Sequence, residues 1–413
     1  MRQTMLRSFQ GVVINRNYGL FLAGSFVSAL GSWLLTVAQG WLVLQLGNSD
    51  FLLGLASFAQ MAPLLILGMP GGAVADRVDR RLLLLVTQIV ALLASAALAL
   101  LAVLGRVQVS TLLLVALVTG LANAFMWPAW SAFIKDLVGP EQLRAAVATN
   151  SARFNLTRVL GPAIGGVILA RYGSAACLIA GTVMMLGVTA ALVAIRTPPA
   201  KPAPRRHWRE VLTSGATYAW QHQQVRGILL VTAFMALFGS SYQAFLPAFA
   251  RDVLRIGPQG LGWELGAVGV GAVAGAIASG RPRVARQPAR AMLYLLGLAG
   301  GGLLLFALAS SPLVALPALA LIGFATIAFL AIANASVQLA VPDNIVGGVM
   351  GVWVVVNAGL VPIGSLLIGA VAEWLTVAVA VGVAGLICAG LSVALLIVQH
   401  KAPGRRALRA ARS

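Results

Sequence analysis

Charged residues are scarce in this sequence. Only 9% of its 413 residues are Asp, Glu, Lys or Arg, whereas 60% are hydrophobic. A soluble globular protein carries about 25% charged residues. A shortage of this size excludes a water-soluble chain, because too little polar surface would be left to face water. The composition therefore predicts a protein whose surface mostly faces lipid.

Cysteine and clustered histidine are also lacking. The two cysteines, Cys177 and Cys388, each lie inside an apolar run without a cysteine or histidine neighbour, so we expect core residues rather than a metal site or a disulfide. No histidines or carboxylates cluster at one depth, as a membrane-embedded enzyme would need. No phosphate-binding loop of the Walker type is present, which excludes ATP as the direct energy source. We therefore expect no enzyme activity and no cofactor.

Basic residues are in large excess, and the net charge is +19. They are confined to short segments between apolar runs, with no interleaved aromatic residues and no sustained basic helix. This distribution argues against nucleic acid as a partner. It is typical of residues that set the orientation of membrane helices.

Apolar runs of about 20 residues predict twelve transmembrane helices. The expected ranges are 18–45, 51–75, 82–104, 110–133, 145–170, 174–196, 224–248, 259–280, 290–309, 312–336, 346–371 and 376–399. The even number places both termini on one side. Lys and Arg gather in the loops of that side, and the other loops hold only Arg106, Arg171, Arg251 and Arg255. The positive-inside rule then puts both termini in the cytoplasm.

The longest polar segment, 197–223, divides the spans into two sets of six. Its prolines 198, 199, 202 and 204 stop the preceding helix and stiffen the segment. We predict a six-helix bundle at 1–196, a cytoplasmic linker at 197–223, and a second six-helix bundle with a basic tail at 224–413. This layout is typical of transporters that bind their substrate between two bundles at mid-membrane.

A charged loop between the second and third spans reads Gly72-Ala-Val-Ala-Asp-Arg-Val-Asp-Arg-Arg81. It resembles the signature G-x-L-A-D-R-x-G-R-K of the major facilitator superfamily. Asp79 stands where that family usually has glycine. The resemblance implies an all-α fold of twelve transmembrane helices in two six-helix bundles. It also implies a cytoplasmic gate, formed by Gly72, Asp76, Arg77, Arg80 and Arg81.

Within this gate, Gly72 is expected to let helices two and eleven approach closely. The anionic Asp76 can face the positively polarised start of a neighbouring helix. The family resemblance implies that this helix is the eleventh. The arginines are expected to pair with Asp76 and Asp136 or to bind lipid phosphate. The corresponding loop of the second half, 275–283, has Ser279 in place of the aspartate, so no gate charge is expected there.

A second motif lies in span five, where the sequence resembles the G-P-x-x-G-G part of an exporter motif. The residues concerned are Gly161, Pro162, Gly165 and Gly166. Pro162 removes a backbone donor and is expected to bend the helix. The glycines let a neighbouring helix pack on the bend. Ordinary small-residue packing is the alternative interpretation.

Further segments resemble the branch that contains the enterobactin exporter and macrolide efflux proteins. They are Trp41–Leu44, Trp127–Trp130, Gln338–Asp343 and Pro362–Ser365. The resemblance implies efflux of a small molecule across a bacterial inner membrane. We expect a secondary transporter that exports an amphipathic drug-like or siderophore-like molecule by alternating access, with proton coupling. Transport of a lysophospholipid or other lipid, and a non-transporting membrane sensor, are the alternatives.

Few charges fall inside the spans. Arg158 lies about 20 Å along the helix from Arg144, near the membrane centre. No acidic residue lies at the middle of a span, so Arg158 is either neutralised by polar neighbours or binds an anionic group of the substrate. Among the acidic residues Glu264 comes closest, in the first turns of span eight from the outside, and it is the candidate for proton coupling. The other interpretation makes Glu264 a solvated residue at the outer mouth.

Polar and aromatic residues at helical spacing predict a cavity lining suited to an amphipathic molecule. Including Arg158, the substrate-binding candidates are Gln39, Asn123, Trp127, Arg158, Phe238, Tyr242, Trp353 and Asn357. Ordinary hydrogen bonds between helices are the alternative for each polar residue. The expected partners are a small-molecule substrate and membrane lipids, with no nucleic acid, and we expect a monomer.

Overall fold

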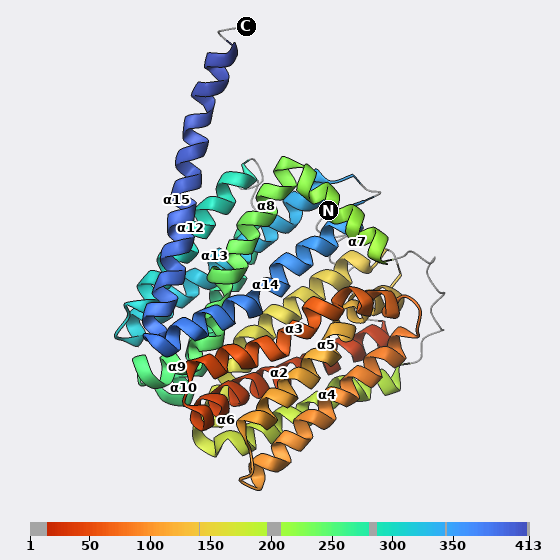
Figure 1. The fold of residues 1–413 in the computed structure, drawn as a ribbon. Coiled ribbons are helices and arrows are strands. Elements are labelled where there is room, and N and C mark those ends of the chain that lie inside the picture. The colour runs from red at the N-terminus through yellow and green to blue at the C-terminus, as the bar shows by residue number, and fades with distance from the viewer. Residues whose placement is uncertain (1–14, 140, 196–207, 281–286, 343–344, 411–413) are drawn as a thin grey trace. The chain divides into compact units, whose positions relative to one another are not determined.

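The computed structural model describes residues 15–139, 141–195, 208–280, 287–342 and 345–410. Within these ranges every regular element is a helix (Figure 1). The first part of the linker (197–207), part of the loop at 275–283 and Asp343 of the Gln338–Asp343 segment lie outside the described residues.

In the described residues of the first half, five helical elements account for six membrane spans. They are α2 (Arg16–Gly47), α3 (Asp50–Ala75), α4 (Arg80–Val103), α5 (Val109–Leu137) and α6 (Leu143–Ala194). The 52 residues of α6 are interrupted at Gly173, whose backbone is non-helical (φ 79°, ψ 176°). Glycine tolerates this conformation without strain, so the chain reverses there and spans five and six follow one another.

The second half begins with a short helix, α7 (Trp208–Gln221), inside the predicted linker. Span seven is broken into α8 (Gln223–Phe234), η1 (Met235–Ser240), η2 (Ser241–Phe245), α9 (Leu246–Ala248) and η3 (Phe249–Val253). The remaining spans are α10 (Gly257–Ser279), α12 (Pro288–Ala307), α13 (Pro312–Ala340), α14 (Val346–Trp374) and α15 (Val377–Ala410).

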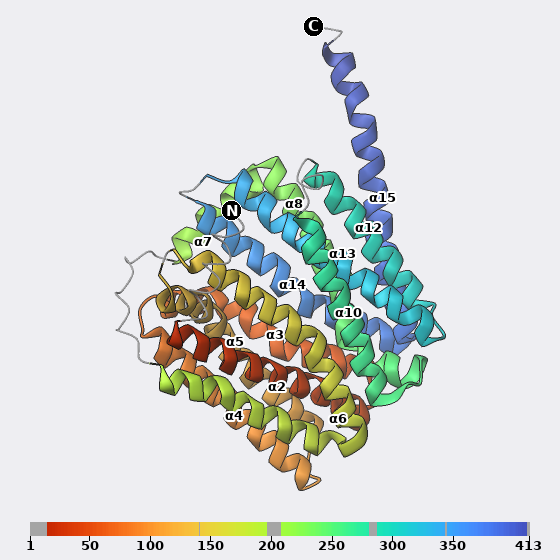
Figure 2. The ribbon, with the colours of Figure 1, turned by 180° about the vertical axis from the view of Figure 1, so that it is seen from behind.

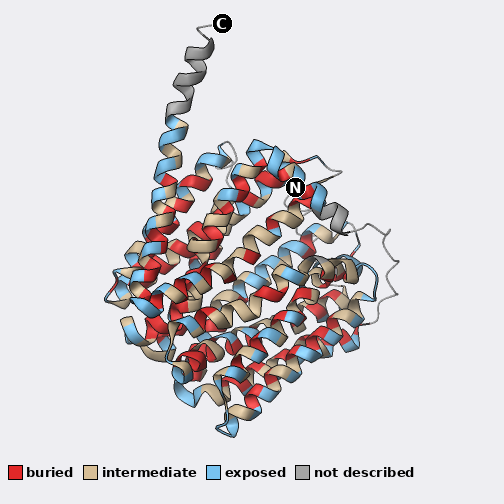
Figure 3. Cartoon of the chain, viewed as in Figure 1, coloured by how far each residue is buried: buried red, intermediate tan, exposed pale blue. Residues whose placement is uncertain are grey.

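Eleven helical stretches in the described ranges are long and apolar enough to cross a membrane. Because α6 holds two spans on either side of Gly173, the predicted twelve-helix fold is confirmed. Large apolar side chains such as Ile66 and Leu93 are 71% and 62% exposed, as a lipid-facing surface requires. Figure 3 shows buried and exposed residues alternating along the helices.

Polar residues at loop positions set the helix starts. The side chains of Asn15, Ser49 and Asp79 accept hydrogen bonds from the backbone N–H groups of Tyr18, Leu52 and Leu82. These caps satisfy donors that have no partner inside the helix. Pro288 and Pro312 stand at the first position of their helices, where a missing N–H costs nothing.

The chain folds into two compact units. The first comprises Met1–Val211 and Ala244–Gly266, and the second comprises Leu212–Gln243 and Ala267–Ser413. The end of span seven and the start of α10 therefore pack with the first unit. The bundle boundaries expected from the sequence, at 196 and 224, stay a prediction.

Within the first unit, α2 lies along α6 in both views (Figures 1 and 2). Glycines allow this approach. A Cβ atom built on Gly24 would lie 2.5 Å from the carbonyl oxygen of Gly187, and one built on Gly31 would lie 2.5 Å from that of Gly181. Such small-residue contacts are how membrane helices gain packing without a hydrophobic driving force.

Both units contain a span with an internal proline that packs on the first span of its own half. In α6, Gly161 beside Pro162 lies against the side chain of Trp33 in α2. In α14, Gly364, two residues after Pro362, lies against Leu237 and Ser241 of span seven. The Ser241 hydroxyl donates to the carbonyl of Val361 at 2.9 Å, which places a donor at this bend. Each half thus places a proline-containing span against its own first span.

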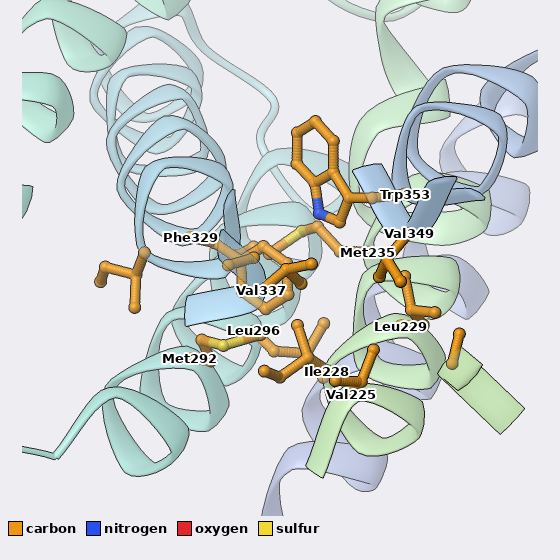
Figure 4. Packing of buried hydrophobic residues seen from close by; sticks show 14 of the residues in the cluster. Val225, Ile228, Leu229, Met235, Met292, Leu296, Phe329, Val337, Val349 and Trp353 are labelled. Carbon is orange, nitrogen blue, oxygen red and sulfur yellow. The ribbon is translucent and has the colours of Figure 1, made fainter. Parts of the chain in front are cut away.

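Each unit has its own apolar core. In the first unit the core contains Tyr18, Phe21 and Phe133 together with Ala75 and Leu84, which lie at the ends of α3 and α4 next to the loop at 72–81. In the second it joins Met235, Phe329, Val349 and Trp353 with residues from the starts of α8 and α12 (Figure 4). The core of the first unit thus holds the helix ends that carry the candidate gate.

Candidate gate and translocation residues

Arg80 joins the ends of three helices in the gate loop. Its Nη1 donates to both carboxylate oxygens of Asp136, at 2.8 and 3.0 Å. Nη2 lies 3.5 Å from Asp76 Oδ1, and Nε donates to the carbonyl of Ala75 at 3.3 Å. Arg80 at the start of α4 therefore ties the end of α3 to the end of α5. Its side chain is only 17% exposed, so these charge-assisted bonds are partly shielded from water.

Arg81 binds elsewhere. Its Nε and Nη2 donate to the carbonyls of Leu192 and Val193, at 2.6 and 3.0 Å. These carbonyls belong to the last turn of α6, where a helix has unpaired acceptors and a partial negative charge. Arg81 thus fastens α4 to the end of span six. Arg77 and Asp76 are exposed at the surface of the loop.

Asp79 departs from the family pattern for a local reason. Its side chain caps α4 by accepting a hydrogen bond from the backbone N–H of Leu82 at 3.1 Å. Aspartate is among the best residues at this position, whereas glycine offers no side-chain acceptor.

The tightly packed glycine is Gly71, which directly precedes the loop in α3, rather than Gly72. A Cβ atom built on Gly71 would lie 2.5 Å from the carbonyl oxygen of Ala124 in α5. One built on Gly72 would first meet Pro128, at 3.9 Å. The sequence motif begins at Gly72, so the motif did not identify the adjacent Gly71 as the packing residue. The role of Gly72 toward helix eleven stays a prediction.

The exporter-like motif of span five faces two helices. Gly161 and Gly165 lie against α2, at Trp33 and Leu34. Gly166 lies against Gly262 of α10, so that a Cβ atom on Gly166 would come 2.8 Å from the Cα of Gly262. Pro162 contributes its carbonyl to the same crossing, 2.8 Å from a Cβ atom built on Gly262. The motif thus combines a bend with small-residue packing on both sides.

Glu264 follows this crossing by two residues in α10. It is 0% exposed, and neither carboxylate oxygen accepts a hydrogen bond from the described residues. The interpretation of Glu264 as a solvated residue is therefore wrong. The sequence placed it close to the end of a span, but the helices around it exclude water.

The substrate-binding candidates fall in both units. In the first, Gln39, Asn123 and Arg158 are partly buried and Trp127 is 53% exposed. In the second, Phe238 and Asn357 are partly buried, Trp353 belongs to the apolar core and Tyr242 is fully buried. The Tyr242 ring meets that of Phe306 edge-on, with centroids 6.5 Å apart. Their role in binding substrate stays a prediction.

Two features of these spans were not predicted. Span seven contains two π-helical segments, around Phe238 and at Phe249–Val253, and such segments are frequent at functional sites. The run Gly239-Ser-Ser241 is the signal in the sequence, because small polar residues support irregular helix.

The second feature is a set of hydrogen bonds from Arg251 to the C-terminal end of α2. Its guanidinium donates to the carbonyl of Leu44 at 3.0 Å and to the side chain of Asn48 at 2.9 Å. Asn48 ends α2 in the left-handed conformation. Nothing in the sequence indicated this long-range contact.

The whole described chain matches one family of known proteins. The family described as "Transmembrane secretion effector" matches residues 14–410. The chain belongs to this major facilitator family. It is a multi-pass membrane protein and a transporter, not an enzyme, which confirms the fold and class expected from the loop at 72–81.

Curated relatives match over most of their lengths. The chain is 24% identical to the staphyloferrin A transporter of Staphylococcus aureus, over 86% of this chain and 89% of that protein. It is 28% identical to the enterobactin exporter EntS of Escherichia coli and of Shigella boydii, over 92% of this chain and 90% of those proteins.

Solved structures share the fold at lower identity. A bacterial homologue of the human lysosomal transporter Spinster, in an inward-facing conformation, matches with a TM-score of 0.67 and 15% identity over 95% of both chains. A peptide transporter of the POT family matches with a TM-score of 0.76 and 15% identity, over 93% of this chain and 94% of that one. These matches establish the fold alone.

Replacing Asp76 with asparagine is expected to reduce transport strongly while leaving the protein in the membrane. The change removes the charge that faces Arg80 and that the family resemblance assigns to the gate. Asp79→Asn is the matched control, because asparagine caps a helix as well as aspartate does. Transport by each variant is measured in vesicles at equal membrane content. Wild-type transport by Asp76→Asn would remove the gate role.

Proposed function

We propose that this transporter exports amphipathic, siderophore-like molecules across the bacterial inner membrane by alternating access, coupled to proton entry. The observation that carries the proposal is similarity over about nine-tenths of the chain to an enterobactin exporter and a staphyloferrin A transporter. The gate loop and the exporter-like bend add support from two separate regions of the chain.

Glu264 is our candidate for the coupling proton. An ionised carboxylate that is buried without partners costs roughly several kcal/mol, and a carboxyl group avoids this cost by binding a proton. Within the described residues, no other acidic side chain is fully buried. Titratable groups inside a membrane are typical of proton relays. Its position two residues beyond the crossing of α6 and α10 would let helix movement expose it.

We further propose that both termini lie in the cytoplasm and that the protein acts as a monomer surrounded by lipid. The distribution of Lys and Arg supports the orientation. A reporter fused after Arg251 is expected to lie outside the cytoplasm, and one fused at the C-terminus inside. An enzyme reporter active only in the cytoplasm checks this, and activity after Arg251 would overturn the topology.

Flux measurements in proteoliposomes test the proposed function. Purified protein is reconstituted, and movement of enterobactin is followed with and without an imposed pH gradient. We expect transport that exceeds that of empty liposomes and accelerates when protons can move in the opposite direction. Transport without any effect of the gradient would remove proton coupling, and no transport of a siderophore panel would remove the substrate class.

A further inference from the structure

Arg153 places a positive charge among neutral groups inside the first unit. It lies ten residues after the start of α6, about 15 Å along the helix and thus well below its end. Its Nη1 donates to the carbonyl of Ser25 in α2 at 2.9 Å, and its Nε to the side chain of Asn150 at 3.2 Å. The guanidinium lies over the ring of Trp130 in α5, 5.5 Å from the centroid.

None of these partners carries a negative charge. Three of the carboxylates are engaged elsewhere, because Arg80 pairs with Asp76 and Asp136, and Arg251 pairs with Asp252. The ten acidic residues of the sequence include none at the middle of a span. An uncompensated charge in a membrane protein is costly, and such residues mark substrate or ion pathways. A purely structural tie to Ser25 and Asn150 would need only a neutral donor.

The guanidinium still has donors to offer. An arginine carries five N–H groups. Within the described part of the chain, Nη2 donates to no residue. One face of the group is covered by Trp130, whose own ring lies 4.6 Å from that of Phe21. A planar oxygen anion matches the N–H groups that remain free, and the partly buried ring of Trp130 beside them suits the apolar part of an amphiphile.

We propose that Arg153 binds the anionic oxygen group of the transported molecule and so makes the protein select anionic over neutral amphiphiles. This inference rests on the proposed transport function and names the charge class of its substrate. It assigns the role to Arg153, whereas the sequence suggested Arg158, five residues nearer the membrane centre. The depth of Arg153 favours a carboxylate or similar anion of the substrate over a lipid phosphate, since headgroups lie at the helix ends.

A matched pair of fluorescent probes tests this proposal. Dansyl-glycine and dansyl-glycinamide have the same size, but only the first carries a carboxylate, and both gain fluorescence in apolar sites. Binding is titrated with purified protein in detergent. We expect the wild type to bind dansyl-glycine about ten-fold more tightly than the amide, as a charge-assisted bond would give.

Variants locate the preference. Arg153→Gln is expected to bind both probes equally. Arg153→Lys keeps the positive charge but lacks the planar guanidinium group, so we expect it to prefer dansyl-glycine over the amide by about three-fold or less. If Arg153→Gln does not fold, the result with Arg153→Lys tests the proposal. Arg171→Gln removes an exposed arginine of the same helix and is expected to behave as the wild type. No preference in the wild type, or an undiminished one in the Arg153 variants, overturns the proposal.

Two further arms separate the alternatives. Arg158→Gln tests the neighbouring arginine, and loss of the preference in that variant alone would move the site to Arg158 and overturn the assignment. Adding anionic lipid to the detergent tests whether a lipid headgroup occupies the site. Binding of anionic lipid to the protein without binding of dansyl-glycine would also overturn the assignment. Because binding needs no flux, a failure of siderophore transport is distinguishable from a failure of this proposal.

Discussion

Replacing Gly262 with alanine is expected to lower transport by about ten-fold, equal to about 1.4 kcal/mol in the rate-limiting barrier. The added Cβ atom would lie 2.8 Å from the carbonyl oxygen of Pro162 and 3.1 Å from the Cα of Gly166. Both are backbone atoms that cannot rotate away, so α10 and α6 must separate at the bend. The measurement is flux in proteoliposomes, with valine at the same position expected to abolish it.

Gly266→Ala is the matched control, one helical turn further along α10. A Cβ atom there meets nothing within 4 Å. Alanine also favours helix over glycine by about 1 kcal/mol, so this variant is expected to fold and to transport as the wild type. Equal activity of the Gly262→Ala and Gly266→Ala proteins would show that the close crossing is unimportant for transport.

Replacing Glu264 with glutamine is expected to abolish the acceleration of export by an imposed pH gradient. Glutamine keeps the size and polarity of the side chain but cannot gain or lose a proton. The buried side chain has no described partner to rescue it, so little else should change. Substrate flux is compared with and without the gradient, and exchange of substrate across the membrane without a gradient is expected to persist.

Glu141→Gln provides the control for this second prediction. Glu141 precedes α6 and is exposed, so the same substitution there is expected to leave the response to the gradient intact. A wild-type response in the Glu264→Gln protein would remove Glu264 from coupling. Loss of the response in both variants would instead point to a general effect of the lost charge.

The membrane spans were predictable because their signals are local. Apolar runs give the lengths, and capping residues such as Asn15, Ser49 and Asp79 mark the starts. Span seven is the exception: its hydrophobicity predicted a continuous helix, but packing against α14 at Gly364 accompanies a π-helical and 3-10 course. Such departures follow from contacts that no local pattern contains.

The gate loop also combines contacts that the sequence predicted with contacts that only the structure revealed. Its motif predicted that Asp76 and Arg80 act together, and Arg80 indeed links Asp76 to Asp136. The motif did not predict that Arg81 binds the end of α6, because Leu192 and Val193 lie more than a hundred residues away in the sequence. The tight glycine, Gly71, is likewise identified only by its neighbour Ala124.

The sequence by itself determined that this is a twelve-span membrane transporter with a charged loop after span two. Hydrophobicity, loop charge and motif order depend only on residues that are close together in the sequence. Only the tertiary structure decided how the intramembrane charges are surrounded. Glu264 is fully buried, and Arg153 lies among Ser25, Asn150 and Trp130. Both environments arise because several helices meet at these positions. The surroundings of a charged group are set by such neighbours rather than by its own segment of the sequence.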